Sequence, residues 1–481
     1  MNMYLMTILL YAVILVFSGW FIGKHIKGAS EFFVAGRSFG WKLLFTTLLA
    51  ANIGAGSTVG VAGIAYKSGI SAWWWIGSSA IGSLLLAYLV GPRIWAISQK
   101  YNLYTLGDYL DIRYAKTLRI VISLMMTIGT LALFAGQLLG IAWILNVVAG
   151  IEKIYGTLIG AFVVVIYFAA GGLRAAAIVN ILELVIILVG FVVATPYALS
   201  YIGGWDALTQ IISTNINNPI KTQAYFAWDG IGTTTILGYL LILTPSFCIS
   251  PGLIGKIYGA KDVQTVKIGT MLNAVVQFAF AFLPVILGMC AFAAFPHLTQ
   301  SELALPTAMK EMMPFGISAL ALAAIFAAEV STADAVLYML ATAFTKDLYK
   351  EMIKPNVNEQ ELLKVGRIVT IVGGGLGVII ALFMPNIITA LQIFYSLMSV
   401  SLAAPFLCGL FSRRASAKGA FASALGGVST VFYLQVFNAG KGIWLLNVSS
   451  TGIVVSVVIM LISMYVVPNK SILDDGMRNF K

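Results

Sequence analysis

Thirteen apolar stretches recur along this chain of 481 residues, and each is long enough to cross a bilayer as a helix. Polar and charged residues gather in the short connections between them. Because a helix satisfies its own backbone hydrogen bonds, this pattern predicts an all-α membrane protein with about 13 transmembrane helices. The expected segments are 4–23, 41–66, 73–97, 118–147, 154–170, 175–200, 231–250, 266–295, 316–345, 366–384, 387–411, 417–437 and 446–467.

Two of these segments are interrupted inside the membrane. The interruption at 50–60 contains glycines, an asparagine and two hydroxyl side chains, and the one at 244–252 contains two prolines. Transporters place unwound backbone where it lines a cavity, so that carbonyl groups bind ions and helix ends bind solute. The alternative is that glycine is simply common in membrane helices because it permits close packing.

The spacing of the two interruptions predicts the domain organisation. They lie five segments apart, which fits two five-helix repeats of inverted topology. We therefore expect one transporter domain over 1–481, with a first repeat at 41–200 and a second at 231–411. An extra N-terminal helix at 4–23 and two extra C-terminal helices within 417–467 would flank the repeats.

The ninth segment carries two hydroxyls and two acids at 327–335, where hydrocarbon would exclude them. Ala328, Ser331 and Thr332 stand at i, i+3 and i+4 and share one helix face. Hydroxyl and carbonyl oxygens form a hard, neutral ligand set that suits a hard cation. The alternative is that both hydroxyls only bond to carbonyls one turn earlier in their own helix.

Composition agrees with a membrane protein, since 60% of residues are hydrophobic and 10% are charged, against about 25% charged in soluble domains. The net charge of +11 is unevenly placed. If the thirteen segments alternate across the membrane, one side receives 24 of the 29 basic residues, including those of the long charged link at 346–364, which we expect to be solvated. The other side receives five, which are Lys67, Lys153, Lys221, Lys310 and Lys441.

This asymmetry predicts a multi-pass protein of the cytoplasmic membrane with its N-terminus outside and its C-terminus in the cytoplasm. It also explains the positive charge without a nucleic-acid partner. The three cysteines have no metal-binding spacing, and the sequence contains no histidine cluster, P-loop or nucleophile elbow, so we do not expect an enzyme.

Six short motifs, in order, resemble those of the sodium/solute symporter family. The resemblance runs nearly end to end and implies a LeuT-like five-plus-five inverted repeat. It also implies secondary active uptake of a small solute driven by a sodium gradient, with sodium as the coupling ion. The motifs lie at 30–37, 50–53, 104–114, 171–175, 328–332 and 409–420.

By the same resemblance, one sodium ion would sit between the broken first core helix and the eighth core helix. Its ligands would be the carbonyl oxygens of Ala50, Ile53 and Ala328 and the hydroxyls of Ser331 and Thr332. This set agrees with the shared helix face deduced above.

Three positions depart from the family pattern. Asn180 stands where relatives commonly have an aspartate, Glu183 where they have a glutamine, and Glu329 where they have a small or apolar residue. Glu329 could bind an amine-bearing solute, could titrate and couple transport to protons, or could be a protonated structural carboxyl group. A proton-coupled or dual-ion symporter is therefore the main alternative function, and a membrane sensor that does not transport is a further one.

The solute cannot be read from the sequence, although small side chains along the broken helix suit a small amino acid, carboxylate or amine better than a bulky sugar. Each candidate contact has an alternative role as an interhelical hydrogen bond. We expect a functional monomer in the lipid bilayer. The candidate solute contacts are Asn52, Ser57, Gln137, Thr244, Ser246, Glu329 and Gln392.

Overall fold

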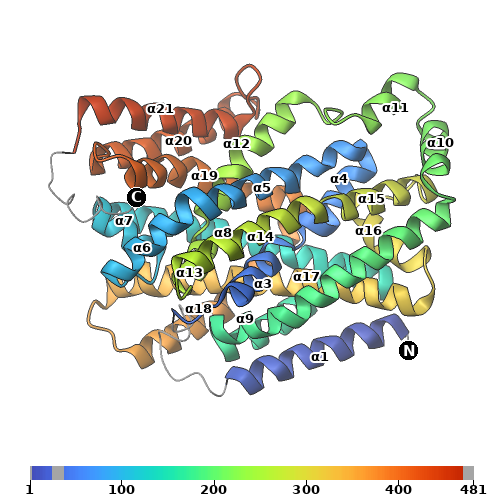
Figure 1. The fold of residues 1–481 in the computed structure, drawn as a ribbon, viewed down its shortest axis with the longest axis horizontal. Coiled ribbons are helices and arrows are strands. Elements are labelled where there is room, and N and C mark those ends of the chain that lie inside the picture. Colours follow the sequence, from blue (N-terminus) through green and yellow to red (C-terminus); the bar gives the residue numbers. More distant parts are fainter. Residues whose placement is uncertain (1–2, 24–36, 470–481) are drawn as a thin grey trace.

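The computed structural model describes residues 3–23 and 37–469, and within these residues it is built of helices (Figure 1). Within these residues, Phe39 and Ala260 form an isolated β-bridge, which is not part of a strand. The predicted all-α fold is confirmed. The main helices are α1 (Met3–Gly23), α3 (Trp41–Asn52), α4 (Val61–Ser68), α5 (Trp73–Leu85), α6 (Gly91–Tyr101), α7 (Leu106–Arg113), α8 (Lys116–Ala149), α9 (Lys153–Ile202), α12 (Thr233–Ile249), α13 (Pro251–Tyr258), α14 (Val263–Phe280), α15 (Phe282–Ala294), α17 (Phe315–Thr342), α18 (Glu359–Phe383), α19 (Ile387–Phe411), α20 (Ala417–Phe437) and α21 (Val448–Val466).

Ten helical stretches of the described residues are long and apolar enough to cross a membrane, and two shorter apolar stretches, Met3–Ser18 and Lys153–Ile166, lie within α1 and α9. The chain is therefore a multi-pass membrane protein. The count of thirteen stays a prediction, because α9 runs as one helical element through 153–202, where the sequence predicts two segments. The motif at 171–175 lies within α9, and residues 30–36 of the first motif lie outside the described part of the chain.

The two predicted interruptions are both present. Helix α3 ends at Asn52, and Ile53 has an extended backbone with φ −101° and ψ 94°. The chain resumes as the π-helical turn η2 (Gly56–Gly60) and then as α4. The second interruption falls at Ser250, between α12 and α13, where Pro251 begins the new helix. Proline suits this first position because its missing N–H has no partner there anyway.

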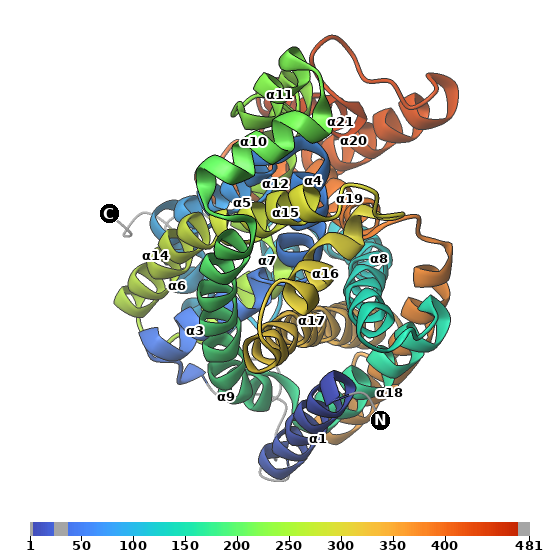
Figure 2. The same ribbon diagram turned by 90° about the vertical axis from the view of Figure 1, so that its right-hand side faces the viewer.

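Helix α17 occupies the interior and packs against α8, α9 and α3. Figures 1 and 2 show α1 at one edge of the bundle and the pair α20 and α21 at the opposite edge. The helices α10 (Trp205–Ile216), α11 (Pro219–Phe226) and α16 (Ala304–Glu311) cover the end of the bundle away from α6 and α7. The fold thus places both interruptions beside the buried helix α17.

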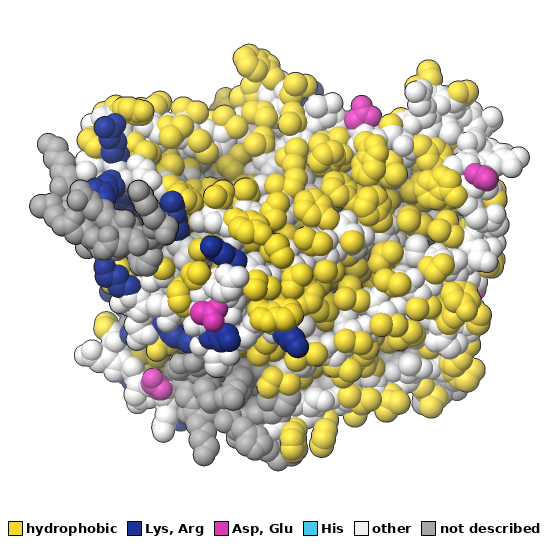
Figure 3. Space-filling view, viewed as in Figure 1, with side chains coloured by type: hydrophobic (Ala, Val, Ile, Leu, Met, Phe, Trp, Pro, Cys, Tyr) yellow, Lys and Arg dark blue, Asp and Glu magenta, His cyan; other side chains and the backbone are white. Residues whose placement is uncertain are grey.

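The surface in Figure 3 carries hydrophobic side chains across its middle, as a lipid-facing belt requires. Lys and Arg gather at the end where α6, α7 and α13 lie, and few are visible at the end with α10 and α11. The described residues thus keep the charge asymmetry found in the sequence. Which end faces the cytoplasm stays a prediction.

The expectation of a solvated link at 346–364 is wrong for its first half. A π-type helix, η6 (Ala343–Ile353), continues α17 without a break, and Lys346 and Asp347 are buried. The connection to α18 is therefore short. The burial has a direct cause, because Asp347 pairs with Arg119 of α8 over 2.7 Å.

Candidate functional site

Five oxygens converge where the break after α3 meets α17. The Thr332 hydroxyl lies 3.1 Å from the Ala50 carbonyl oxygen and 3.0 Å from that of Ile53. The Ser331 hydroxyl lies 3.1 Å from the carbonyl oxygens of Ala50 and Ala328. All five residues are buried. The structure thus brings the predicted sodium ligands together, and their assignment as ligands remains a prediction.

The break explains why these carbonyl groups are available. In a continuous helix the Ala50 carbonyl oxygen would accept from the N–H of Gly54. Here the Gly54 N–H donates to the Ser57 hydroxyl over 3.0 Å instead. The helix end therefore presents oxygens that α17 can reach, and pure back-bonding within α17 is wrong for Thr332, whose hydroxyl contacts α3.

The break is stabilised by two of the predicted solute contacts. The Ala55 N–H donates to Gln137 Oε1 on α8 over 2.9 Å. The Ser57 hydroxyl lies 3.0 Å from the Asn52 carbonyl oxygen as well as accepting from Gly54. Both side chains satisfy backbone groups that the unwinding releases, and neither lines the cavity described next.

A cavity of about 50 Å³ lies beside the convergent oxygens, between α3, α8, α12, α13, α17 and α19. Its polar lining consists of Asn52, Ser246, Ser250, Lys256 and Thr332, besides the phenol of Tyr395. The volume accommodates a few water molecules, so a bound solute requires the walls to separate. Two of the predicted solute contacts, Asn52 and Ser246, are therefore on the cavity wall.

Thr244 and Gln392 lie elsewhere. The Thr244 hydroxyl donates to the Ser78 carbonyl oxygen over 3.0 Å and joins α12 to α5. Gln392 is exposed on α19 and does not line the cavity. Their roles in solute binding stay predictions that this geometry does not favour.

A buried polar cluster next to Asn52 was missed in the sequence. The Asn52 amide donates to Asn273 Oδ1 on α14 over 3.2 Å, and Gln277 Nε2 lies 3.4 Å from the same oxygen. Ser79 and Ser83 of α5 lie 3.5 Å from Gln277 Oε1. The sequence signal that could have revealed this cluster is helical periodicity. Asn273 and Gln277 stand at i and i+4, as do Ser79 and Ser83, so each pair shares a helix face.

Glu329 contacts η2 and α8 beside the sodium candidate. Its carboxyl group accepts a 2.9 Å hydrogen bond from Thr58 of η2, while Oε2 has no hydrogen-bond partner among the residues that the structure describes. It packs against Gly140 of α8, where an added Cβ would lie 2.7 Å from the carboxyl carbon. Glu329 therefore joins three elements behind the sodium candidate and does not line the solute cavity. This arrangement fits the structural hypothesis best.

The other two departures from the family pattern complement each other. With its amide oriented to satisfy both polar atoms, Asn180 donates to Glu183 over 2.8 Å and to the Ala176 carbonyl oxygen over 3.1 Å. Both side chains are buried in α9. Asn180 thus donates to Glu183, the acid that stands where relatives have a glutamine.

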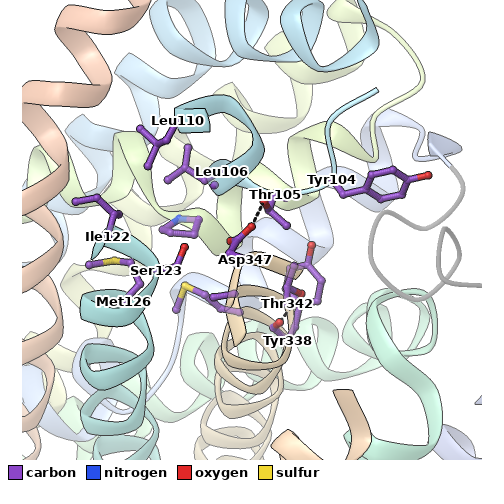
Figure 4. Close-up of a pocket in the computed structure, with 15 residues that line it drawn as sticks. Tyr104, Thr105, Leu106, Leu110, Ile122, Ser123, Met126, Tyr338, Thr342 and Asp347 are labelled. Carbon is purple, nitrogen blue, oxygen red and sulfur yellow. Dashed lines mark hydrogen bonds between the residues drawn. The ribbon is translucent and has the colours of Figure 1, made fainter. Parts of the chain in front are cut away.

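Ion pairs close one end of the bundle. Arg119 of α8 is 5% exposed and reaches Asp108 and Asp347 over 2.7 Å each, and Asp111 and Glu351 over 3.3 Å each. The Thr105 hydroxyl donates to Asp347 over 2.6 Å beside a cavity of about 30 Å³ (Figure 4). These contacts hold α7, α8 and η6 together at the end we expect to face the cytoplasm.

The interrupted helix α3 corresponds to the first core helix of the sequence motifs, and the buried helix α17 corresponds to the eighth. Together with the neutral oxygens that converge between them, they define an ion-coupled secondary transporter. A family model described as the sodium:solute symporter family matches residues 32–427, and the chain belongs to that family. It is thus a sodium-coupled solute transporter rather than an enzyme.

Individual proteins similar to this chain are also named as symporters or cotransporters. The chain is 29% identical to the sodium/pantothenate symporter of Escherichia coli, with 83% of each protein covered. It is 26% identical to the sodium/glucose cotransporter of Vibrio parahaemolyticus, covering 90% of this chain and 84% of that protein. It is also 26% identical to the uncharacterized symporter YidK of E. coli, covering 95% and 82%.

A solved structure of a Na⁺-coupled sialic acid symporter in an outward-open state superposes with a TM-score of 0.81 at 18% identity. It covers 96% of this chain and 98% of that one. At this identity the likeness establishes the fold, which is the LeuT-like architecture that the sequence motifs imply.

Proposed function

We propose that this protein imports a small organic solute together with sodium by alternating access. The convergence of five neutral oxygens between α3 and α17 carries the proposal. Such a set can replace a sodium hydration shell without a full counter-charge. Among the described residues no cluster of histidine, cysteine and acidic side chains offers a competing metal site.

Coupling follows from where the ligands lie. Ala50 and Ile53 belong to the broken helix, whereas Ala328, Ser331 and Thr332 belong to α17. A bound ion would hold these two elements together and favour the conformation in which they touch. Loss of the ion would release them, so that ion binding shifts the population of the two states.

The solute class we propose is a small amino acid, carboxylate or amine. Pantothenate and sialic acid, named for two of the similar proteins, are small organic acids, and glucose, named for another, is a neutral sugar. We further propose that the protein works as a monomer in the cytoplasmic membrane with its N-terminus outside. A proton-coupled or dual-ion symporter is the second candidate, supported by the buried acids Glu183 and Glu329.

The test is thermal unfolding of the purified protein in sodium and in potassium at equal ionic strength. Sodium at 100 times its dissociation constant should stabilise the wild type by about 2.7 kcal/mol. Ser331→Ala and Thr332→Ala should each lose about tenfold in sodium affinity, because an interaction with a charge contributes about 1.5 kcal/mol or more.

Thr370→Ala is the matched control, because its hydroxyl is also buried and donates to a carbonyl group of its own helix, 2.9 Å away in α18. It should respond to sodium as the wild type does. Equal sodium affinities for the wild type and both site variants would refute the assigned ligands.

A further inference from the structure

A lysine side chain lines the candidate solute cavity. Lys256 lies in α13, six residues after the Ser250 break, and is 2% exposed. Its ammonium group donates to the Thr47 carbonyl oxygen of α3 over 2.7 Å. An ammonium group has three donors, and this is one bond. A charged side chain buried in the protein interior is costly unless something else pairs with it.

The rest of the cavity wall offers Lys256 no negative partner. Among the described residues the lining includes Lys256 and no acid. Asp334 of α17 interacts electrostatically with Lys256, but within the described part of the chain neither of its oxygens makes a hydrogen bond, and it does not line the cavity. Glu329 is also outside the lining, so Lys256 is the one Lys, Arg, Asp or Glu side chain that the described part of the lining presents to a solute.

Two neighbouring features favour an anion at the same place. The cavity is lined by Ser250 and Gly252 at the start of α13, where the first N–H groups of a helix lack intrahelical partners and carry partial positive charge. The Ser250 side chain does not cap these groups. On the other wall, Asn52 leads into the neutral cluster of Asn273 and Gln277, which suits hydroxyl or amide groups.

We infer that the transported solute carries a carboxylate group, which binds the Lys256 ammonium group within this cavity. The inference rests on the proposed sodium-coupled transport and narrows its solute to an organic acid. Within that class, it favours molecules with a carboxylate at one end and neutral hydrogen-bonding groups at the other. An amine-bearing solute without a carboxylate would meet a like charge.

The first experiment uses wild-type protein and thermal unfolding in sodium. The panel consists of matched pairs, in which each acid is tested beside its primary amide: pantothenate, lactate, sialic acid and the common amino acids. Glucose and choline are added as neutral and cationic probes. At least one carboxylate should stabilise the protein in sodium more than in potassium, and its amide should not. Stabilisation by a probe without a carboxylate, or by no carboxylate at all, overturns the inference.

The second experiment compares Lys256→Gln with Lys256→Arg and with the control Lys267→Gln. Lys267 lies on α14 near the same end of the bundle and does not line the cavity. Lys256→Gln should lose at least tenfold in affinity for the stabilising acid, and the other two variants should retain binding. Wild-type affinity in Lys256→Gln would refute the contact.

Sodium alone separates the two hypotheses. If sodium stabilises the wild type and Lys256→Gln equally while no carboxylate binds, the solute class is wrong and the sodium site stands. If sodium stabilises neither protein, the proposed coupling itself fails.

Discussion

The Thr332 hydroxyl lies 3.0 Å from the Ile53 carbonyl oxygen, although 279 positions separate the two residues along the chain. The contact joins the broken helix to the buried helix α17 at the sodium candidate. It forms because the backbone at Ile53 is extended and its carbonyl group has left the helical hydrogen-bond pattern. The geometry of this short break therefore decides whether the oxygens converge.

Gly54→Ala tests the break directly. A Cβ at Gly54 would press on the Thr332 hydroxyl and would lie 2.7 Å from Gln137 Oε1. We expect Thr332 to be displaced, stability to fall by about 1–3 kcal/mol, and the half-saturating sodium concentration for uptake to rise about tenfold or more.

Gly375→Ala is the control, since a Cβ built there on α18 meets no described atom within 4 Å apart from neighbouring residues of its own helix. It should leave sodium dependence unchanged and stabilise the helix by up to about 1 kcal/mol. If Gly54→Ala behaves like this control, the close approach of Gly54 to α17 has no part in ion binding.

Each half of the sodium candidate could be predicted from the sequence because its signals are local. Ser331 and Thr332 share a helix face, and an asparagine amid glycines marks the unwound stretch at 50–60. The relation between the two stretches came from the family resemblance. The distance between α3 and α17 depends on the packing of all the core helices, which hydropathy does not specify.

Lys256 shows where such reasoning fails. In the charge count along the sequence, Lys256 follows the seventh apolar segment and falls on the side expected to face the cytoplasm. In the structure the chain re-enters a helix at Pro251, and α13 carries Lys256 into the interior. Hydropathy reports that a lysine follows an apolar run. It does not report that the helical span continues past the break and packs this lysine against α3 and the cavity.

The cluster around Arg119 predicts a large loss of stability on neutralisation. Arg119→Gln leaves Asp347, which is 3% exposed, without its cationic partner. Breaking a buried pair in this way costs about 3 kcal/mol or more. Chemical or thermal unfolding in detergent measures the loss.

The same variant should loosen the end of the bundle held by α7, α8 and η6. A cysteine at Ser123, which lines the adjacent cavity, should then react faster with a maleimide than in the wild-type background. Arg93→Gln, at an exposed arginine on α6, should change stability by less than about 1 kcal/mol. Unchanged stability and reactivity in Arg119→Gln would contradict a closing role for this network.

Orientation in the membrane is testable at two exposed lysines. Lys221 lies on α11, and Lys354 lies between η6 and α18 at the opposite, cation-rich end. We expect a cysteine at position 221 to react with an impermeant maleimide in intact cells and one at position 354 to react only after permeabilisation. Cys408, which is partly exposed, is replaced by serine first, while Cys248 and Cys290 are buried. The reverse labelling pattern would place the N-terminus in the cytoplasm.

Glu329→Gln distinguishes a packing role from a role in solute or ion binding. The Thr58 hydroxyl lies 2.9 Å from both Glu329 Oε1 and the Gly54 carbonyl oxygen, and a hydroxyl has one hydrogen to donate. A glutamine amide keeps the size of the side chain and supplies both a donor and an acceptor at this position. We therefore expect Glu329→Gln to retain stability, sodium affinity and solute affinity within about twofold, equivalent to about 0.4 kcal/mol.

Glu329→Leu and Gly140→Ala complete the comparison. Leucine removes the acceptor that Thr58 faces, and a Cβ at Gly140 would lie 2.7 Å from the carboxyl carbon of Glu329. Both should destabilise the protein by about 1–3 kcal/mol, because Glu329→Leu removes a buried hydrogen bond between η2 and α17, and Gly140→Ala overpacks the contact between α8 and α17. If instead Glu329→Gln folds normally but loses transport, the negative charge itself acts on the ion or the solute. The packing explanation would then have to be abandoned, since the amide preserves every contact that the carboxyl group makes with η2 and α8.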